Sequence, residues 1–390
     1  MDEITVVGGG VAGLVAAIAC AEGGAPVRLL EAHEALGGRG RSTSGPFVAN
    51  LGPHVLYANG TLWRFMRERE LLPPMGRPPL SGVFFRAGGR RRRTPPLTLA
   101  RAVLKLWRTP EAPDDVSFRD WVASRCGDEA AAWLSAACGV FAFHHDPGEL
   151  AAGFAWARFR QAFLDLPPRA RYARGGWGTL IGALERGARE RGVRIETGAR
   201  VSDLSETGPG PTIVATELRD ARSLLDDEAL AWPSGRTLAL DLGLRARRGD
   251  PFVVWDLDEA GWIERFSAPD RTLAPKDHAL VQAQMPLRPG ESADDGERRL
   301  ETLLDAGLRD WRERVAFRRR QVLDAKTGAL DLPGTSWRDR PAIDRGDGVL
   351  LCGDSVAASG LLSDPAVTSA LEAARLAVAQ AALRPETSRL

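Results

Sequence analysis

The chain has 390 residues, of which 44% are hydrophobic and 26% charged, so neither a disordered nor a membrane-spanning protein is expected. Its net charge of +1 gives no reason to expect a nucleic-acid partner, and its four cysteines, with no Cys-x-x-Cys pair, fit a reducing cytoplasm. No apolar stretch approaches the ~20 residues of a transmembrane helix, and the first three residues leave no room for a signal peptide. The length exceeds that of one ordinary core, so two domains are expected.

An apolar run at residues 4–7 predicts a strand that leads directly into a Gly-x-Gly-x-x-Gly turn at the start of a predicted helix. Gly8 permits the tight turn, Gly10 lets the backbone approach a pyrophosphate, and Gly13 allows the helix to pack closely on the strand. The N-terminus of the helix then faces the diphosphate with its partial positive charge. The residues expected to hold the diphosphate of a dinucleotide are Gly8, Gly10, Val11, Ala12 and Gly13.

A second strand is predicted at residues 27–30, and Glu31 and Ala32 follow it. This position, about 20 residues after the glycines, is where a carboxylate accepts hydrogen bonds from the ribose of an adenosine. The glycine pair ending at Gly38 and the arginine Arg39 favour FAD over NAD, because a plain NAD-binding domain has no need for these residues. The glycines let the chain pass closely beneath the cofactor, and Arg39 places a planar cation beside the pyrophosphate.

Residues 8–39 resemble the flavoprotein superfamily of amine oxidases, protoporphyrinogen oxidases and phytoene desaturases, whose hallmark is this fingerprint followed by Glu-Ala and Gly-Gly-Arg. Residues 348–355 and 365–370 are similar to the closing motif of the same superfamily, and residues 268–275 resemble its phytoene desaturase-like branch. The resemblance implies contacts to the ribityl and diphosphate region and to the pyrimidine edge of the flavin. The residues implied are, in that order, Gly353 and Asp354, and Val367 and Thr368.

The resemblance also implies an α/β fold, with a Rossmann-like, glutathione reductase-type FAD-binding domain assembled from separated segments and an inserted α+β substrate domain. The expected segments are 1–61, 172–221 and 334–390 for the FAD-binding domain, and 62–171 and 222–333 for the substrate domain. Further strands of the FAD-binding domain are expected at residues 193–197, 199–204 and 212–216. Val201, in the second of these, is implied to pair its backbone with the adenine edge.

The inserted segments predict helices and strands of their own. A glycine turn at residues 88–89 predicts a hairpin. Apolar spacing predicts helices at 118–122, 130–143, 150–163 and 294–311, and strands at 236–243, 252–257 and 279–285. The arginines at 90–93 could contact anionic lipid at the membrane surface, but we favour a solvated outer strand for them.

Residues 45–54 resemble the strand and turn that enter the flavin pocket, which places Gly52 and Pro53 beside the cofactor. His54 is the first candidate for a catalytic residue, because an imidazole can donate a hydrogen bond or move a proton at neutral pH. His144 and His145 have no third ligand beside them, so no metal site is expected.

These observations predict an FAD-dependent oxidoreductase, a desaturase or oxidase that transfers a hydride from a small or apolar organic substrate to flavin N5. The substrate is expected between the two domains, and oxygen or another acceptor would reoxidise the flavin.

Oxidation of an amine or a protoporphyrinogen is the alternative within the superfamily. We favour it less, because the chain has only two tyrosines, Tyr57 and Tyr172, and no lysine in a matching context; Lys276 is the least unsuitable. Rab GDP-dissociation inhibitors resemble this fold and carry lipids without a flavin, so the fold alone does not establish catalysis. Glu31, Arg39 and the Gly-Asp pair argue against such a carrier, and the C-terminal motif argues against a pure NAD(P) dehydrogenase.

Overall fold

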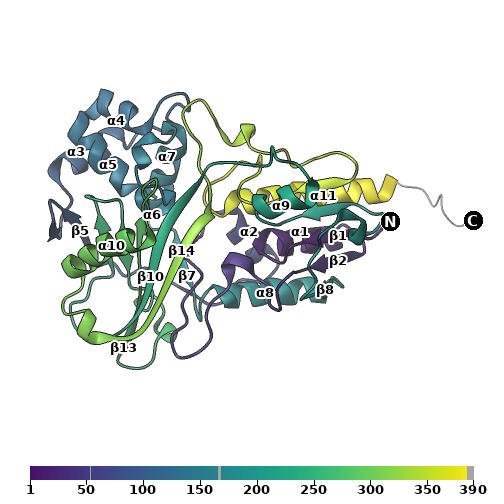
Figure 1. The fold of residues 1–390 in the computed structure, drawn as a ribbon, viewed down its shortest axis with the longest axis horizontal. Coiled ribbons are helices and arrows are strands. Elements are labelled where there is room, and N and C mark those ends of the chain that lie inside the picture. Colours follow the sequence, from purple (N-terminus) through teal and green to yellow (C-terminus); the bar gives the residue numbers. More distant parts are fainter. Residues whose placement is uncertain (53, 166–167, 384–390) are drawn as a thin grey trace, which may run out of the picture.

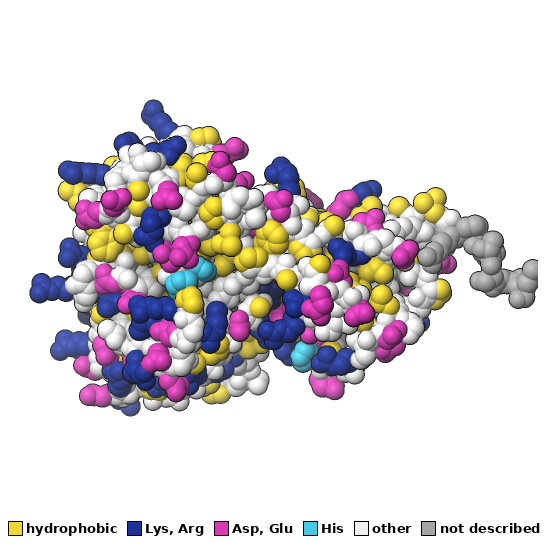
Figure 2. Space-filling model, turned by 45° about the horizontal axis from the view of Figure 1, so that its top comes forward, with side chains coloured by type: hydrophobic (Ala, Val, Ile, Leu, Met, Phe, Trp, Pro, Cys, Tyr) yellow, Lys and Arg dark blue, Asp and Glu magenta, His cyan; other side chains and the backbone are white. Residues whose placement is uncertain are grey.

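Two β-sheets, one parallel and one mostly antiparallel, form the two halves of the molecule (Figure 1). The computed structural model describes residues 1–52, 54–165 and 168–383. The N-terminus and the C-terminal helix lie in the half that holds the parallel sheet, and Figure 2 shows the molecule narrowing between the halves.

The first sheet has five strands in the order β15-β9-β1-β2-β8, and every neighbouring pair is parallel. The strands, in chain order, are β1 (Ile4–Val7), β2 (Val27–Leu30), β8 (Arg194–Glu196), β9 (Thr212–Val214) and β15 (Val349–Leu351). The strands are short, and all except the edge strand β8 are mostly apolar because helices cover the sheet, as parallel sheets require. These helices are α1 (Val11–Glu22), α2 (Thr61–Glu68), α8 (Trp177–Glu190), α9 (Leu218–Leu225) and α11 (Asp364–Leu383). α1 packs against both α8 and α11, so the glycine turn lies at the centre of this half.

The second sheet has seven strands in the order β14-β10-β13-β12-β11-β5-β6. Neighbours are antiparallel except β11 and β5. The strands, in chain order, are β5 (Val83–Ala87), β6 (Arg90–Arg92), β10 (Ser234–Arg245), β11 (Val253–Asp256), β12 (Trp262–Glu264), β13 (His278–Pro286) and β14 (Val315–Ala329). The odd-numbered residues of β13, from Val281 to Met285, join the core under α10 (Ala293–Gly307). Since side chains alternate along a strand, Leu280, Gln282 and Gln284 face the other way.

A helical layer covers part of this second half. It contains α3 (Leu97–Leu106), α4 (Phe118–Cys126), α5 (Asp128–Ala137), α6 (Gly139–Ala142) and α7 (Ala152–Phe159), which a π-helical turn at Arg160–Leu164 extends. A small sheet of β3 (Leu56–Tyr57), β7 (Ala170–Ala173) and β4 (Met75–Gly76) connects the layer to the parallel half. Among the described residues, no helix combines the length and hydrophobicity that crossing a bilayer requires.

The α/β fold class expected from the sequence is confirmed. The strands of the parallel sheet lie within segments 1–61, 172–221 and 334–390, and the exact domain boundaries stay a prediction. The hairpin around Gly88 is present, and α4, α5, α7 and α10 account for most of the predicted helices. The helix expected at 130–143 divides at Gly139, where a Cβ would lie 2.0 Å from the carbonyl oxygen of Ala260.

One strand expectation was wrong, and one strand was not expected. Residues 199–204 form a loop, because Asp203 and Glu206 make a capping box that starts a 3-10 helix at Leu204–Thr207. The strand β14 was not expected, because its many arginines and other polar residues leave no clear alternation of apolar and polar residues in its sequence. It forms because Val315–Ala329 pairs along nearly all of β10, and such pairing is not encoded locally.

Candidate functional site

The glycine turn lies where β1 ends, and each glycine has a distinct steric reason. Gly8 has φ of +107°, and a Cβ on Gly13 would lie 1.9 Å from the carbonyl oxygen of Gly8. Gly10 differs, because nothing lies within 4 Å of an added Cβ there. No side chain caps the first turn of α1, to which Val11 and Ala12 belong, so its N–H groups face the same open space. This arrangement suits a diphosphate.

Glu31 follows β2 and is a buried carboxylate with several donors. Its Oε2 accepts from the Gly9 N–H at 2.8 Å, and its Oε1 accepts from the His33 N–H at 2.9 Å and from Nδ1 of the same residue at 2.7 Å. Burial acts to raise the pKa of Glu31, but these hydrogen bonds together lower it below its ordinary value. The carboxylate is therefore ionised at neutral pH. Ala32 is half-buried beside it.

Val201 lies in the loop after β8. The N–H of Ala199, just before it, donates to the backbone oxygen of Glu31 at 2.8 Å. The loop therefore reaches the same edge of the sheet as the glycine turn and Glu31, the edge where a nucleotide binds in parallel α/β sheets.

Arg39 and Asp354 are 315 residues apart in sequence and form an ion pair, with Nη1 and Oδ2 separated by 2.8 Å. Burial acts to raise the pKa of Asp354, but the charge and hydrogen bond of Arg39, together with smaller contributions, keep that pKa below its ordinary value. The N–H of Gly353 donates to Ser369 Oγ on α11 at 3.0 Å, which holds the Gly-Asp pair against that helix. Gly38 has φ of +50°, and a Cβ there would lie 3.6 Å from Cα of Gly10. The structure thus brings both sequence motifs together.

Val367 and Thr368 lie at the start of α11. Val367 is fully buried in the core of the parallel half. Thr368 is half-buried and lines an open pocket of about 630 Å³ between α2 and α11.

His54 is held as a neutral hydrogen-bond donor. Its Nε2 lies 2.7 Å from the carbonyl oxygen of Arg39, which only accepts, and its ring packs on Trp177 with 4.6 Å between centroids. Burial, with the charge of Arg39, lowers the pKa of His54 to about 4. This environment disagrees with the expectation that His54 moves protons at neutral pH, and it leaves a positioning role. Gly52, nearby, has φ of +104°, and Pro53 lies outside the described residues.

A polar cluster joins the loop at residues 41–52 to the second sheet. The backbone oxygen of Asn50 accepts from Gln282 Nε2 at 3.2 Å and from Arg319 Nη2 at 2.6 Å. Both donors also bind the fully buried Asp241, Gln282 at 2.5 Å and Arg319 Nε at 2.6 Å. The loop at residues 41–52 is therefore fixed to the face of the second sheet.

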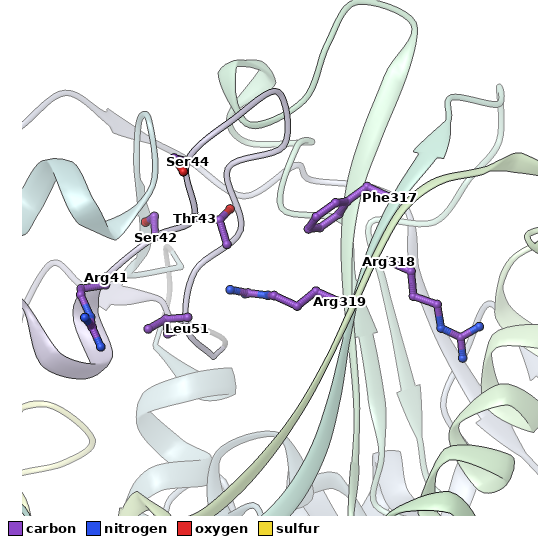
Figure 3. A pocket seen from close by; sticks show the side chains of 8 residues that line it. All are labelled: Arg41, Ser42, Thr43, Ser44, Leu51, Phe317, Arg318 and Arg319. Carbon is purple, nitrogen blue, oxygen red and sulfur yellow. The ribbon is translucent and has the colours of Figure 1, made fainter.

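Beside this cluster lies an open pocket of about 570 Å³ between the loop and β14. Figure 3 shows Arg319 extending from β14 toward Thr43 and Leu51, whereas Arg318 points to the opposite side of the strand. The pocket is lined by Arg41, Ser42, Thr43, Ser44, Leu51, Phe317, Arg318 and Arg319.

Two adjacent rows of cross-strand partners make the face of the second sheet polar. One row contains Glu264, Gln282, Asp241 and Arg319, and the next contains Trp262, Gln284, Ala239 and Gln321. Aligned partners share a face. Gln284 is 2% exposed, and neither atom of its amide has a hydrogen-bond partner among the described residues. Within the same described part of the chain, Gln282 Oε1 and Trp262 Nε1 also lack partners.

Glu264 stands at the end of the first row and accepts a 2.5 Å hydrogen bond from the hydroxyl of Tyr172. Burial raises the pKa of Glu264 to about 8. Burial and the charge of Glu264 also raise the pKa of Tyr57 above its ordinary value. Both tyrosines of the chain therefore adjoin one buried carboxyl group.

The sequence analysis did not single out Glu264, Gln282 or Gln284. Their signal was polar residues at alternate positions of otherwise apolar strands, which is unusual for a buried strand. Lys276 is exposed, away from this cluster, whereas Lys326 offers its carbonyl oxygen to Arg39 at 3.0 Å. Among the described residues, no group of histidines, cysteines and carboxylates could hold a metal ion.

Comparison with known proteins agrees with this geometry. Residues 6–69 match the family model of the NAD(P)-binding Rossmann-like domain. No curated protein matches the chain in sequence.

The similar solved structures include an oxidoreductase from Methanosarcina mazei, with 16% identity, a TM-score of 0.72, and coverage of 95% of this chain and 99% of the other. Putrescine oxidase bound to putrescine has 15% identity, a TM-score of 0.73, and coverage of 98% and 99%. Cyclohexylamine oxidase from Brevibacterium oxydans has 15% identity, a TM-score of 0.69, and coverage of 97% and 98%. This chain shares their fold. The resemblance to amine oxidase-type oxidoreductases is thus confirmed at the level of the fold.

Proposed function

We propose that this protein is an FAD-dependent oxidoreductase. The observation that carries the proposal is the convergence of the Gly10 turn, Glu31 and the Arg39–Asp354 pair at one edge of the parallel sheet. The similar structures named as an oxidoreductase and as oxidases support it. When bound, FAD supplies the acceptor for a hydride.

The residues present fit this cofactor. Gly10 leaves open space in front of the first-turn amides of α1, which suits the diphosphate. Glu31 is ionised and can accept the ribose hydroxyls, and Arg39 offers a planar cation. His54 holds the carbonyl group of Arg39 and so orients the turn that carries this cation.

Of the small or apolar substrates that the sequence suggested, the polar rows of the second sheet favour a small polar one. Leaving the amide of Gln284 without partners costs roughly 1–3 kcal/mol for each buried group, so we infer that a ligand or water completes its hydrogen bonds. Trp262 Nε1 and Gln284 Nε2 require an acceptor, whereas Gln282 Oε1 requires a donor. A molecule with both kinds of group satisfies this face.

Oxidation of an amine is the second candidate, and Glu264 favours it. A carboxyl group with a pKa of about 8 is mostly protonated at neutral pH, and an ammonium group beside it would stabilise its ionised form. Glu264 would then accept a hydrogen bond from the amino group, and Tyr172 would hold the carboxylate in place.

The absorption spectrum of the purified protein, before and after acid precipitation, is the first test. Flavin bands near ~450 nm and release of FAD are expected. A colourless protein that also rejects added FAD would support the carrier alternative instead.

Anaerobic reduction of the bound flavin then separates the substrate classes. Putrescine and cyclohexylamine should be compared with 1,4-butanediol, cyclohexanol and methylcyclohexane. Amine oxidation predicts bleaching by the amines only, with much slower bleaching in Glu264→Gln. Bleaching by methylcyclohexane alone would contradict the inferred polar substrate.

A further inference from the structure

Residues 71–110 have an unusual charge distribution. This segment of forty residues contains nine arginines and lysines and no aspartate or glutamate, although the whole chain has a net charge of +1. The rest of the chain, taken as a whole, is therefore net acidic.

The segment forms one end of the molecule. It contains the hairpin β5–β6 and helix α3, which lie at the far left of Figure 1, at the end opposite the C-terminal helix α11. Figure 2 shows lysine and arginine side chains projecting from this end. We call the exposed surface of residues 77–108 the basic end.

Large apolar side chains also gather at the basic end. Leu80 is 97% exposed, Leu104 is 74% exposed and Leu97 is 63% exposed. Trp107 and Val83 are exposed as well, so five of the nine exposed large hydrophobic side chains among the described residues lie here. Such a concentration marks an interaction surface, whereas isolated exposed side chains would not.

Helix α3 has two distinct faces. Its inward face, with Leu99, Ala102 and Leu106, packs in the core of the helical layer. Its outward face carries Leu97, Arg101 and Leu104, and Arg108 follows in the turn after the helix, so that these side chains are spaced by three and four residues. The outward side chains are thus alternately apolar and cationic along one stripe of the helix.

Most arginines of the basic end have no ionic partner. Among the described residues, no carboxylate lies within ion-pair distance of Arg90, Arg92, Arg101 or Arg108, and all four are exposed. Arg86 is the contrast, since it pairs with Asp256 at 2.8 Å. On β14 the exposed Arg320 likewise has a partner, because it pairs with Asp294 at 2.6 Å.

We propose that the basic end docks on an anionic lipid bilayer. Leu97, Leu104 and Trp107 would enter the boundary between headgroups and acyl chains, and the unpaired arginines would bind lipid phosphates. Amphipathic helices bind membranes with this combination of apolar and basic side chains, and tryptophan favours that boundary. The exposed leucines suit insertion into a bilayer, and nucleic acid would not require them.

Sedimentation with vesicles tests the proposal on the full chain. Wild type is expected to bind vesicles of phosphatidylcholine with phosphatidylglycerol, and not phosphatidylcholine alone, with affinity falling as salt rises. Each arginine near an anionic surface contributes about fivefold in affinity, so Arg101→Gln with Arg108→Gln should weaken binding about 25-fold. Leu104→Ser with Trp107→Ser should weaken it as well.

Matched controls lie at the other end of the molecule. Arg186→Gln with Arg375→Gln removes two exposed charges from α8 and α11, and Leu383→Ser removes an exposed leucine. Both control variants should leave vesicle binding unchanged, and all variants should keep the far-ultraviolet circular dichroism of wild type.

Absence of vesicle binding at low salt, or equal losses of binding in controls and test variants, would overturn the proposal. Full binding by the Leu104→Ser, Trp107→Ser variant would overturn insertion. None of these results depends on the cofactor, so the proposed function is tested separately.

Discussion

Glu31 shows how one side chain prepares a nucleotide site. Its carboxylate already accepts the N–H of Gly9 and two donors of His33, and these hydrogen bonds lower its pKa. A buried acceptor with a fixed orientation needs no reorganisation when a ribose arrives.

Replacing Glu31 with alanine should therefore weaken FAD binding. We expect a loss of about 10- to 100-fold, since hydrogen bonds to charged groups contribute roughly 1.5–3 kcal/mol. Titration of the apoprotein with FAD measures it. Glu31→Gln keeps the size of the side chain and should lose less affinity for FAD. Unchanged FAD affinity in both variants would show that Glu31 does not bind the ribose.

His54 should make the protein less stable at acidic pH. Its pKa is about 4 in the folded state and 6.5 as an unperturbed group, so between these values the unfolded state binds more protons. The stability that the neutral ring contributes is present above pH ~6.5 and is lost as the pH falls toward 4, by up to about 3 kcal/mol. Denaturant unfolding from pH 4 to 7 measures this, and His54→Gln should have a flatter profile. An equally steep profile would show that other groups cause the loss.

At the scale of elements, β12 and β13 carry polar residues on the face that should be apolar if it served packing alone. Glu264, Gln282 and Gln284 are each at most 3% exposed. Buried polar groups without partners destabilise a fold, so we infer a functional demand for Gln282 Oε1 and the amide of Gln284, which lack partners among the described residues.

Glu264 should produce the opposite pH dependence to His54. Its pKa is raised from 4.5 to about 8, so the folded state binds the extra proton between these values. The contribution of protonated Glu264 to the free energy of unfolding is fully present below pH ~4.5. It is lost as the pH rises through 8, and the loss is up to about 5 kcal/mol. Unfolding of the apoprotein from pH 5 to 9 measures the effect. Glu264→Gln should remove the slope, and Tyr172→Phe, which leaves the carboxyl buried, should keep it.

Gln284→Met should stabilise the protein and impair substrate binding. Removing two unpartnered amide atoms at nearly constant volume should raise the free energy of unfolding by about 1–2 kcal/mol. Gln321→Met is the control, because Gln321 Nε2 donates to Asp241 at 2.9 Å and its loss should destabilise. If Gln284→Met also destabilises, buried water already completes the hydrogen bonds of that amide.

At the scale of the whole molecule, the two halves are joined by a charged cluster. Asp241 lies fully buried on β10, and Arg319 binds both this carboxylate and the backbone of Asn50 in the loop of the parallel half. The cluster therefore fixes the distance between the nucleotide edge and the polar face.

Removing Asp241 should loosen this connection. Asp241→Ala leaves Arg319 partly buried without its carboxylate, and breaking such a pair costs about 3–5 kcal/mol. Thermal unfolding measures the loss, and proteolysis should become faster within residues 41–52. The double variant with Arg319→Leu should recover part of the stability, and no recovery would show that the two residues act independently.

The sequence by itself determined the nucleotide half. Gly8, Gly10 and Gly13, Glu31, and the Gly-Asp pair ending at Asp354 act through backbone conformation and short-range position, which a local pattern encodes. The same holds for β1, α1 and β2, whose apolar periodicity appears in the structure with the predicted bounds of the strands.

Tertiary structure alone decided the contacts between segments that are remote in sequence. The pairing of β10 with β14, the rows that place Glu264 beside Gln282, and the contact between Arg39 and Asp354 all join residues far apart in sequence. The pKa values of His54 and Glu264 also depend on burial by distant segments. Packing between remote elements sets these properties, so no local pattern could contain them.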